Sequence, residues 1–442
     1  MIHQLSCAHQ TEIHFMPQEI ATRELLVSEM AENLIGSEII KLGGEINERI
    51  RRGEKIFNYT IGDFDPKVFP IPAELTDEII QAMHEGHTNY PTANGIIELR
   101  KEVSSFIKNF FSLSYNTDEI LITSGARPAI YATYITLLDA GDKVIFPVPS
   151  WNNNHYTHLS HAQSIMIETS AENNFMPTAD DIRPHVKEAT LISLCSPLNP
   201  TGTVFSEETL TEICDLVLEE NNRRSPDEKP LYLMYDQIYS TLTFGDTKHV
   251  NPVSLRPEMR NYTIFVDGLS KAFAATGVRV GWTFGPQSII DKMKAILSHV
   301  GAWAPKAEQV ASARYLSQQH NINRYLSHFK NEIDYRLENF YKGFMQLKAK
   351  GYAVDAIAPQ AAIYLTVSFD LDGKKTAEGK ILRNTADATA YILEEAKMGI
   401  VPFYAFGSSP DSKWYRLSVG TCTREEIDEV ISNLDKALSK LS

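Results

Sequence analysis

Cysteine is scarce in this sequence. The four cysteines (Cys7, Cys195, Cys214 and Cys422) lie far apart and show no paired spacing. This pattern argues against a disulfide framework, provides no metal-ligand motif, and is typical of proteins in a reducing compartment. We therefore expect a cytoplasmic protein without a metal site.

Long apolar runs and an excess of positive charge are also missing. No run reaches the roughly 18 residues that a membrane span needs, and the first residues, MIHQLSCAHQTEIHF, lack the hydrophobic region of a secretion signal. The formal net charge of −14 argues against nucleic acid or an anionic membrane as the main partner. Anionic substrates remain open, because one local arginine outweighs a distant net charge.

The 442 residues contain no internal repeat, no low-complexity tract and no long linker, and their 43% hydrophobic content is that of an ordinary globular protein. Apolar residues at helical spacing predict a helix over Ser37–Arg52, another from about Gly95, and a charged one through Asn331–Lys350. Two further apolar strands are expected near the end of the chain, at Ala362–Phe369 and Tyr415–Val419.

Short, near-continuous apolar runs between these helices predict strands that are buried on both faces. They are Ile120–Thr123, Val144–Pro147, Leu191–Leu194, Leu231–Tyr235, Thr263–Val266 and Val280–Phe284. Such runs are typical of a mostly parallel sheet covered by helices. We expect an α/β fold with a large domain over residues 60–325, a smaller α+β domain from residues 36–59 and 326–442, and an N-terminal extension over residues 1–35.

One lysine stands out, in the segment Asp267-Gly268-Leu269-Ser270-Lys271 that directly follows an apolar strand. The end of a strand places the amine at the mouth of a sheet, where ligands bind in open α/β folds. Ser270 and Arg279, eight positions after the lysine, could bind a phosphate near the amine, because a guanidinium fork suits phosphate. An amine among buried or cationic groups loses its proton readily, as a Schiff-base lysine must.

The segment from Asp267 to Gly281 resembles the active-site signature of the class I/II aminotransferases, which are fold-type-I pyridoxal-phosphate enzymes. The resemblance extends from about residue 36 to the end of the chain. It implies that Lys271 holds pyridoxal 5′-phosphate as a Schiff base. Asp236-Gln237-Ile238-Tyr239 resembles the family's D-x-x-Y element, in which the aspartate pairs with the pyridine nitrogen and the tyrosine donates to the phenolic oxygen.

Further segments resemble the family's cofactor contacts. Asn199, in the N-P-T-G turn, would also contact the phenolic oxygen, and Trp151 would stack on the pyridine ring. The turn Ser124-Gly125-Ala126 would form the phosphate cup, ahead of a helix that we expect to begin near Pro128. Tyr90 would reach the phosphate of the neighbouring subunit, which implies a homodimer with shared active sites.

The resemblance also implies how substrate binds. Arg416, in an R-[IL]-S element, would grip the α-carboxylate, and the backbone of Gly62 would lie beside it, with Trp151 and Asn199 also in contact with substrate. The segment Ala361-Ala362-Ile363-Tyr364 departs from the family's glycine-rich G-x-[FY] stretch, and no site residue is assigned there.

The implied activity is a ping-pong transfer of an amino group from a small amino acid to a 2-keto acid. Arg127 resembles in position a lysine that binds the distal carboxylate in one branch of bacterial aspartate aminotransferases, so aspartate or glutamate is the leading substrate. Arg127 on a helix surface, without that role, is the alternative. Aromatic or alanine-type transamination, a lyase or synthase on the same scaffold, and a regulator that senses ligands are the other hypotheses.

Overall fold

The structure of the chain is a computed structural model that describes residues 27–34, 36 and 38–442. It divides into two compact units, Met1–Ile35 and Gly36–Ser442. In the first unit one short helix is described, α1 (Glu29–Glu32), and the Ser28 hydroxyl at its start accepts a hydrogen bond from Ala31 N. Among the described residues, no helix combines the length and apolar character needed to span a membrane. Cys7 lies outside the described residues, and the other three cysteines are free thiols.

A seven-stranded sheet forms the centre of the second unit, with the strand order β2-β8-β7-β6-β5-β3-β4. The five strands from β7 to β4 run parallel, whereas β8 pairs antiparallel with both of its neighbours. The strands are β2 (Ile120–Thr123), β3 (Lys143–Val148), β4 (Gln163–Glu168), β5 (Ala189–Cys195), β6 (Tyr232–Asp236), β7 (Thr263–Gly268) and β8 (Gly281–Phe284).

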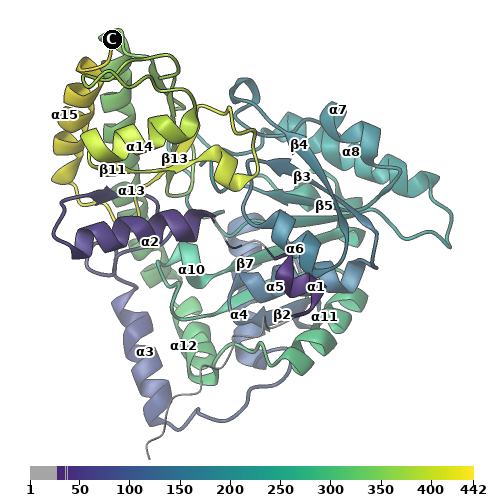
Figure 1. Cartoon of the computed structure of the whole chain (residues 1–442). Helices are drawn as coiled ribbons and strands as arrows, with labels where there is room; N and C mark the ends of the chain where they lie inside the picture. The colour runs from purple at the N-terminus through teal and green to yellow at the C-terminus, as the bar shows by residue number, and fades with distance from the viewer. Residues whose placement is uncertain (1–26, 35, 37) are drawn as a thin grey trace, which may run out of the picture. The chain divides into compact units, whose positions relative to one another are not determined.

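Residues along these strands alternate between two apolar cores, one on each face of the sheet. In β2, Ile120 and Ile122 belong to one core and Leu121 to the other. Because both faces are buried, the strands read as continuous apolar runs. The first core is completed by α3 (Ala73–His84), α4 (Ile97–Phe111), α7 (Ala179–Ile182), α8 (Glu207–Arg223), α9 (Pro252–Leu255) and α12 (Lys306–Leu316). The second core is completed by α5 (Ala126–Leu137), α6 (Asn153–Leu159) and α11 (Gln287–Val300) (Figure 1).

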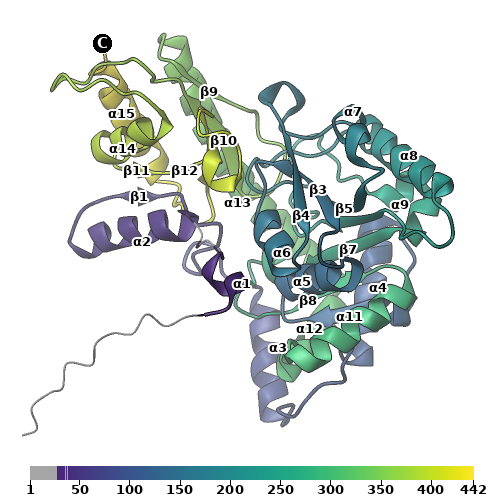
Figure 2. The same ribbon diagram turned by 45° about the vertical axis from the view of Figure 1, so that its right-hand side comes forward.

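The C-terminal part of the chain builds a second, four-stranded antiparallel sheet beside the first. Its strands, in spatial order, are β12 (Val401–Pro402), β13 (Trp414–Ser418), β10 (Tyr364–Phe369) and β9 (Val354–Ala356). Their core includes residues of α13 (Gln319–Ala349), α14 (Thr385–Glu395) and α15 (Glu426–Ser439). Figure 2 shows α2 (Glu38–Arg51) on this side of the unit, with the parallel pair β1 (Phe57–Asn58) and β11 (Met398–Gly399).

The predicted large α/β fold with a mostly parallel central sheet is confirmed. Each apolar run expected in this sheet corresponds to a strand, although Leu231 and Val280 lie one residue before β6 and β8. The start of the helix after β2 was predicted wrongly, because α5 begins at Ala126 rather than near Pro128. The strand β4 was not predicted, since this edge strand is largely exposed and has few buried residues. The domain boundaries remain a prediction. Tyr239, Leu242 and Phe244, which lie inside residues 60–325, pack in the core of the C-terminal sheet.

A close backbone approach between β8 and the turn before α5 fixes the edge of the sheet. A Cβ at Gly281 would lie 2.6 Å from the carbonyl carbon of Gly125 and 2.8 Å from Ala126 N, so only glycine fits there. On the neighbouring strand β7, a Cβ at Gly268 would lie 2.8 Å from the Cα of Gly281. These backbones can lie against each other only because the side chains are absent.

We expect Gly281→Ala to destabilise the fold by about 1–3 kcal/mol, because the added methyl group forces the β2–α5 turn away from β8. Thermal unfolding measures this as a lower midpoint. Gly277→Ala is the matched control, since a Cβ at Gly277 meets no atom within 4 Å. Equal midpoints for the two variants would contradict the packing argument.

Candidate active site

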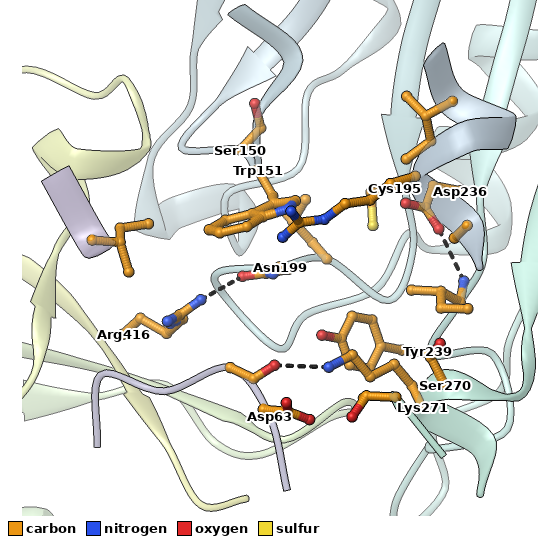
Figure 3. Close-up of a pocket in the computed structure, with 18 of the residues that line it drawn as sticks. Asp63, Ser150, Trp151, Cys195, Asn199, Asp236, Tyr239, Ser270, Lys271 and Arg416 are labelled. Carbon is orange, nitrogen blue, oxygen red and sulfur yellow. Dashed lines mark hydrogen bonds between the residues drawn. The ribbon is translucent and has the colours of Figure 1, made fainter. Parts of the chain in front are cut away.

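A cavity of about 780 Å³ opens at the carboxyl ends of the parallel strands. Leu194 and Cys195 at the end of β5, Asp236 at the end of β6, and Ser270 and Lys271 after β7 line it. Residues from the start of the unit and from β13 close the opposite side. Figure 3 shows Arg416 on one side, Asp236 on the other, and Trp151, Asn199, Tyr239 and Lys271 between them. This is the edge at which open α/β folds bind ligands.

Lys271 projects into this cavity from α10 (Leu269–Ala272), the single helical turn that follows β7. Its Nζ donates a hydrogen bond of 2.7 Å to the carbonyl oxygen of Gly62. Burial lowers the pKa of the Lys271 amine to about 8, Asp63 opposes this, and the charges of the nearby arginines add to it. An amine with this pKa is partly uncharged near neutral pH and can act as a nucleophile or a base.

Asp236 is a carboxylate without a cationic partner. Burial raises the pKa of Asp236 to about 6, against a hydrogen bond of 3.1 Å that Ile238 N donates to its Oδ1. Within the described part of the chain no lysine, arginine or histidine lies within ion-pair distance of it. A buried carboxylate is costly unless it is paired, so this end of the cavity favours a ligand that carries a proton or a positive charge.

Tyr239 and Asn199 lie between Lys271 and Arg416. The Tyr239 hydroxyl is 2.6 Å from the hydroxyl of Tyr364, and both side chains are buried. Burial raises the pKa of Tyr239 well above its ordinary value, so the group stays a neutral hydroxyl at physiological pH. Asn199 Oδ1 accepts a hydrogen bond of 3.1 Å from Arg416 Nη1.

Arg416 is 1% exposed and lies on β13. Besides its bond to Asn199, its Nη2 donates at 2.5 Å to the carbonyl oxygen of Thr60. Its Nε is buried and has no hydrogen-bond partner among the described residues. The Arg416 side chain lines the cavity and offers a carboxylate a forked, positively charged partner.

The turn Ser124-Gly125-Ala126 brings the N-terminus of the twelve-residue helix α5 to Arg279. Arg279 Nη2 donates to the carbonyl oxygen of Ser124 at 2.8 Å, and Nη1 donates to that of Thr276 at 2.7 Å. Gly125 has a φ of +85°, and a Cβ there would lie 2.2 Å from Arg279 Nη2. A helix N-terminus beside an arginine is a favourable place for an anion such as a phosphate.

Arg127, one residue into α5, lines the cavity next to Trp151. Its guanidinium carbon lies 5.5 Å from the centroid of the Trp151 ring, within the range of a cation–π contact. Whether Arg127 binds a distal carboxylate there or only packs on the surface of its helix stays a prediction.

Most of the predicted site residues meet in this one cavity. Its lining includes Gly62, Ala126, Arg127, Trp151, Asn199, Asp236, Tyr239, Ser270, Lys271, Arg279 and Arg416. Ser124 and Gly125 do not line it but contact Arg279, which does. Tyr90 lies outside the lining, with an exposed fraction of 80% and its ring 5.3 Å from that of Trp303.

Sequence reasoning missed several groups of the site. Asp63 follows Gly62 directly, so the Gly62 motif could have identified it. Cys195 ends β5, and burial raises the pKa of its thiol well above the ordinary value, so it is no thiolate nucleophile. Tyr364 lies in a segment that departs from the family pattern. Part of the other missed lining comes from α2, which contributes Ile39, Ile40, Gly43, Gly44 and Asn47.

Comparisons with known proteins show which family this chain belongs to. The chain is 28% identical over 409 residues to the aspartate aminotransferase of Rhizobium meliloti (strain 1021). This match covers 92% of the chain and 94% of that relative. It is 30% identical over 378 residues to a probable aspartate/prephenate aminotransferase of Rickettsia felis. This match covers 85% of the chain and 88% of that relative.

The crystal structure of the aspartate aminotransferase from Rhizobium meliloti is similar to this fold, with a TM-score of 0.85 and 26% identity. The similarity covers 95% of this chain and 100% of that one. Residues 54–434, which include the cavity residues from Thr60 onward, match the family described as aminotransferase class I and II. The chain therefore belongs to the aminotransferase class I and II family.

Proposed function

We propose that this aminotransferase uses pyridoxal 5′-phosphate attached to Lys271. The observation that carries the proposal is a lysine of lowered pKa in the same cavity as a buried carboxylate that lacks a cation. Pyridoxal phosphate offers an aldehyde to the amine and a protonated ring nitrogen to the carboxylate. The residues of the cavity therefore fit this cofactor.

In the proposed arrangement several polar groups of the cavity have a partner on the cofactor. Asp236 would hold the ring nitrogen in its protonated form, and Tyr239 and Asn199 would contact the phenolic oxygen. Trp151 would cover one face of the ring. The phosphate would bind at the N-terminus of α5, with Ser124, Gly125, Ala126, Ser270 and Arg279 around it.

The chain's own groups then bind and orient the substrate. When bound, the cofactor supplies an electrophilic carbon for the substrate amine and a protonated ring that accepts the electron pair released at the substrate Cα. Arg416 would bind the α-carboxylate through its guanidinium, which lines the cavity, and this fixes the direction of the Cα–H bond. Lys271 Nζ would take the Cα proton, because its lowered pKa leaves part of the amine uncharged near neutral pH.

The amino donor that we propose is aspartate or glutamate, with a 2-keto acid such as 2-oxoglutarate as acceptor. Arg127 supports this choice, because it offers a second cation for a distal carboxylate. Both relatives are named for aspartate, as an aspartate aminotransferase and a probable aspartate/prephenate aminotransferase. The apolar residues Ile39 and Ile40 of α2 support aromatic donors as a second class, since they line the same cavity.

The first test of the cofactor assignment is Lys271→Ala. We expect the purified variant to lack the visible absorbance of the bound cofactor and to lose about 10²–10⁴-fold or more in kcat, the range that a positioned acid–base group contributes. Lys292→Ala, on the exposed face of α11, is the matched control and should retain both the visible absorbance and the parent kcat. An unchanged spectrum together with full activity in Lys271→Ala would refute the assignment.

The substrate assignment is tested with Arg127→Ala and a panel of amino donors in the presence of 2-oxoglutarate. We expect kcat/KM for aspartate to fall by about 30-fold or more, because removal of one partner of a buried charge pair costs about 2–5 kcal/mol. Aromatic donors should be much less affected. Arg256→Ala, which removes a surface ion pair with Asp215, is the control. Equal turnover of aspartate by the variant and the parent would rule out Arg127 as the distal-carboxylate residue.

We further propose that the chain forms a homodimer in the cytoplasm, with Tyr90 reaching the cofactor phosphate of the partner. The high exposure of Tyr90 supports this, as does the buried Trp303 Nε1 beside it, which has no hydrogen-bond partner in the structure. Light scattering should give a mass of about twice 49.7 kDa. A fully active monomer would contradict the shared site.

A further inference from the structure

Tyr364 contacts both Tyr239 and Arg416, two residues that line the cavity. It begins β10, beside Ser418 in the register with β13, and is 1% exposed. Its hydroxyl oxygen is 2.6 Å from that of Tyr239, and its ring centroid is 4.8 Å from the guanidinium carbon of Arg416. A Cβ placed at Gly62 would be 2.9 Å from the Tyr364 hydroxyl, so this hydroxyl also borders the backbone that accepts from Lys271.

We propose that Tyr364 is a positioning residue, which donates its hydrogen bond to Tyr239 and so directs the Tyr239 proton into the cavity, toward the phenolic oxygen of the cofactor. The inference rests on the proposed cofactor and adds a residue to its binding. Tyr364 does not touch the reacting atoms. It acts through Tyr239.

The direction of the bond follows from what each hydroxyl can reach. Among the described residues the Tyr364 hydroxyl has one hydrogen-bond partner, Tyr239, and Tyr364 does not line the cavity, so its proton goes to Tyr239. Tyr239 does line the cavity and can donate to a second group there. The titratable groups that act on Tyr364 are Tyr239, Arg416, Cys195 and Asp63. Burial raises the pKa of both tyrosines, and the positive charge of Arg416 opposes this rise in both.

A donor bond from Tyr364 leaves the Tyr239 proton free for another acceptor. Tyr239 lines the cavity, and in the proposed arrangement the phenolic oxygen is this acceptor. A hydroxyl that accepts one hydrogen bond becomes a stronger donor in a second, because hydrogen bonds in a chain polarise one another. Tyr364 thereby strengthens the bond that Tyr239 makes to the cofactor.

The same contacts connect Arg416, which would bind the substrate carboxylate, with Tyr239, which would bind the cofactor. When a substrate carboxylate pairs with Arg416, the positive electrostatic potential at Tyr364 decreases and the Tyr364 hydroxyl becomes a weaker donor. The phenolic oxygen then loses part of its stabilisation and becomes more basic. Binding of the substrate carboxylate is thus transmitted through Tyr364 and Tyr239 to the oxygen beside the reacting nitrogen.

Tyr364→Phe isolates the hydroxyl, because the phenyl ring keeps its contacts with Arg416 and its edge-to-face contact with Tyr239. The matched control is Tyr415→Phe. Tyr415 is equally buried on the adjacent strand, and its hydroxyl donates only to the backbone carbonyl of Thr385, away from the cavity lining.

The test is a pH titration of the visible absorbance of the bound cofactor in the parent, Tyr364→Phe, Tyr239→Phe, the double variant and Tyr415→Phe. We expect Tyr364→Phe to raise the apparent pKa of this transition by about 0.5–1 unit, the size that one ordinary hydrogen bond gives. The reason is that a less stabilised phenolic oxygen holds its shared proton to higher pH. Tyr364→Phe should also lower kcat more than it changes KM, whereas Tyr415→Phe should leave the titration unchanged.

In the Tyr239→Phe background, removal of the Tyr364 hydroxyl should not shift this pKa further, because the Tyr364 hydroxyl acts on the cofactor only through that of Tyr239. An unchanged pKa in Tyr364→Phe overturns the inference, and so does an equal shift in both backgrounds. If the parent protein shows no visible absorbance after incubation with pyridoxal phosphate, the proposed function fails together with this inference. A parent that absorbs without any shift in Tyr364→Phe refutes the inference alone.

Discussion

The arrangement of the cavity depends on one close contact between backbones, that of Gly281 on β8 with the turn at Gly125. Because this contact has no room for a side chain, the turn lies flat against the sheet, and α5 begins at its edge. Arg279, two residues before Gly281, then reaches the carbonyl oxygen of Ser124, and Lys271 follows the neighbouring strand. The anion-binding end of the cavity and the amine are therefore positioned by the same packing.

The charged side chains of the cavity are mostly positive, whereas the whole protein is negative. The chain has a net charge of −14, yet Lys271, Arg127, Arg279 and Arg416 line a cavity with only two carboxylates, Asp63 and Asp236. The three arginines also help to lower the pKa of Lys271. Local groups thus decide what the site attracts, and small dicarboxylic acids match it better than the overall composition suggests.

The sequence was most informative where the chemistry requires a residue at a fixed position on a strand. Lys271 was predicted because it follows an apolar run that the structure shows as a strand, and the resemblance to family motifs gave Asp236 and Arg416. Tyr364 was missed because its importance comes from a contact with Tyr239, 125 positions earlier in the chain. The α2 lining was missed for a similar reason, since helical spacing identifies an apolar face but not what that face covers.

The position of Arg416 in the cavity also bears on how the two halves of a transfer cycle share one site. On the proposed assignment, every amino acid and every keto acid carries the same α-carboxylate, and each pairs with this guanidinium equally well. Donor and product therefore compete for one anchor, and the anchor does not favour either direction. The net direction of transfer would then be set by the concentrations of the acids around the enzyme.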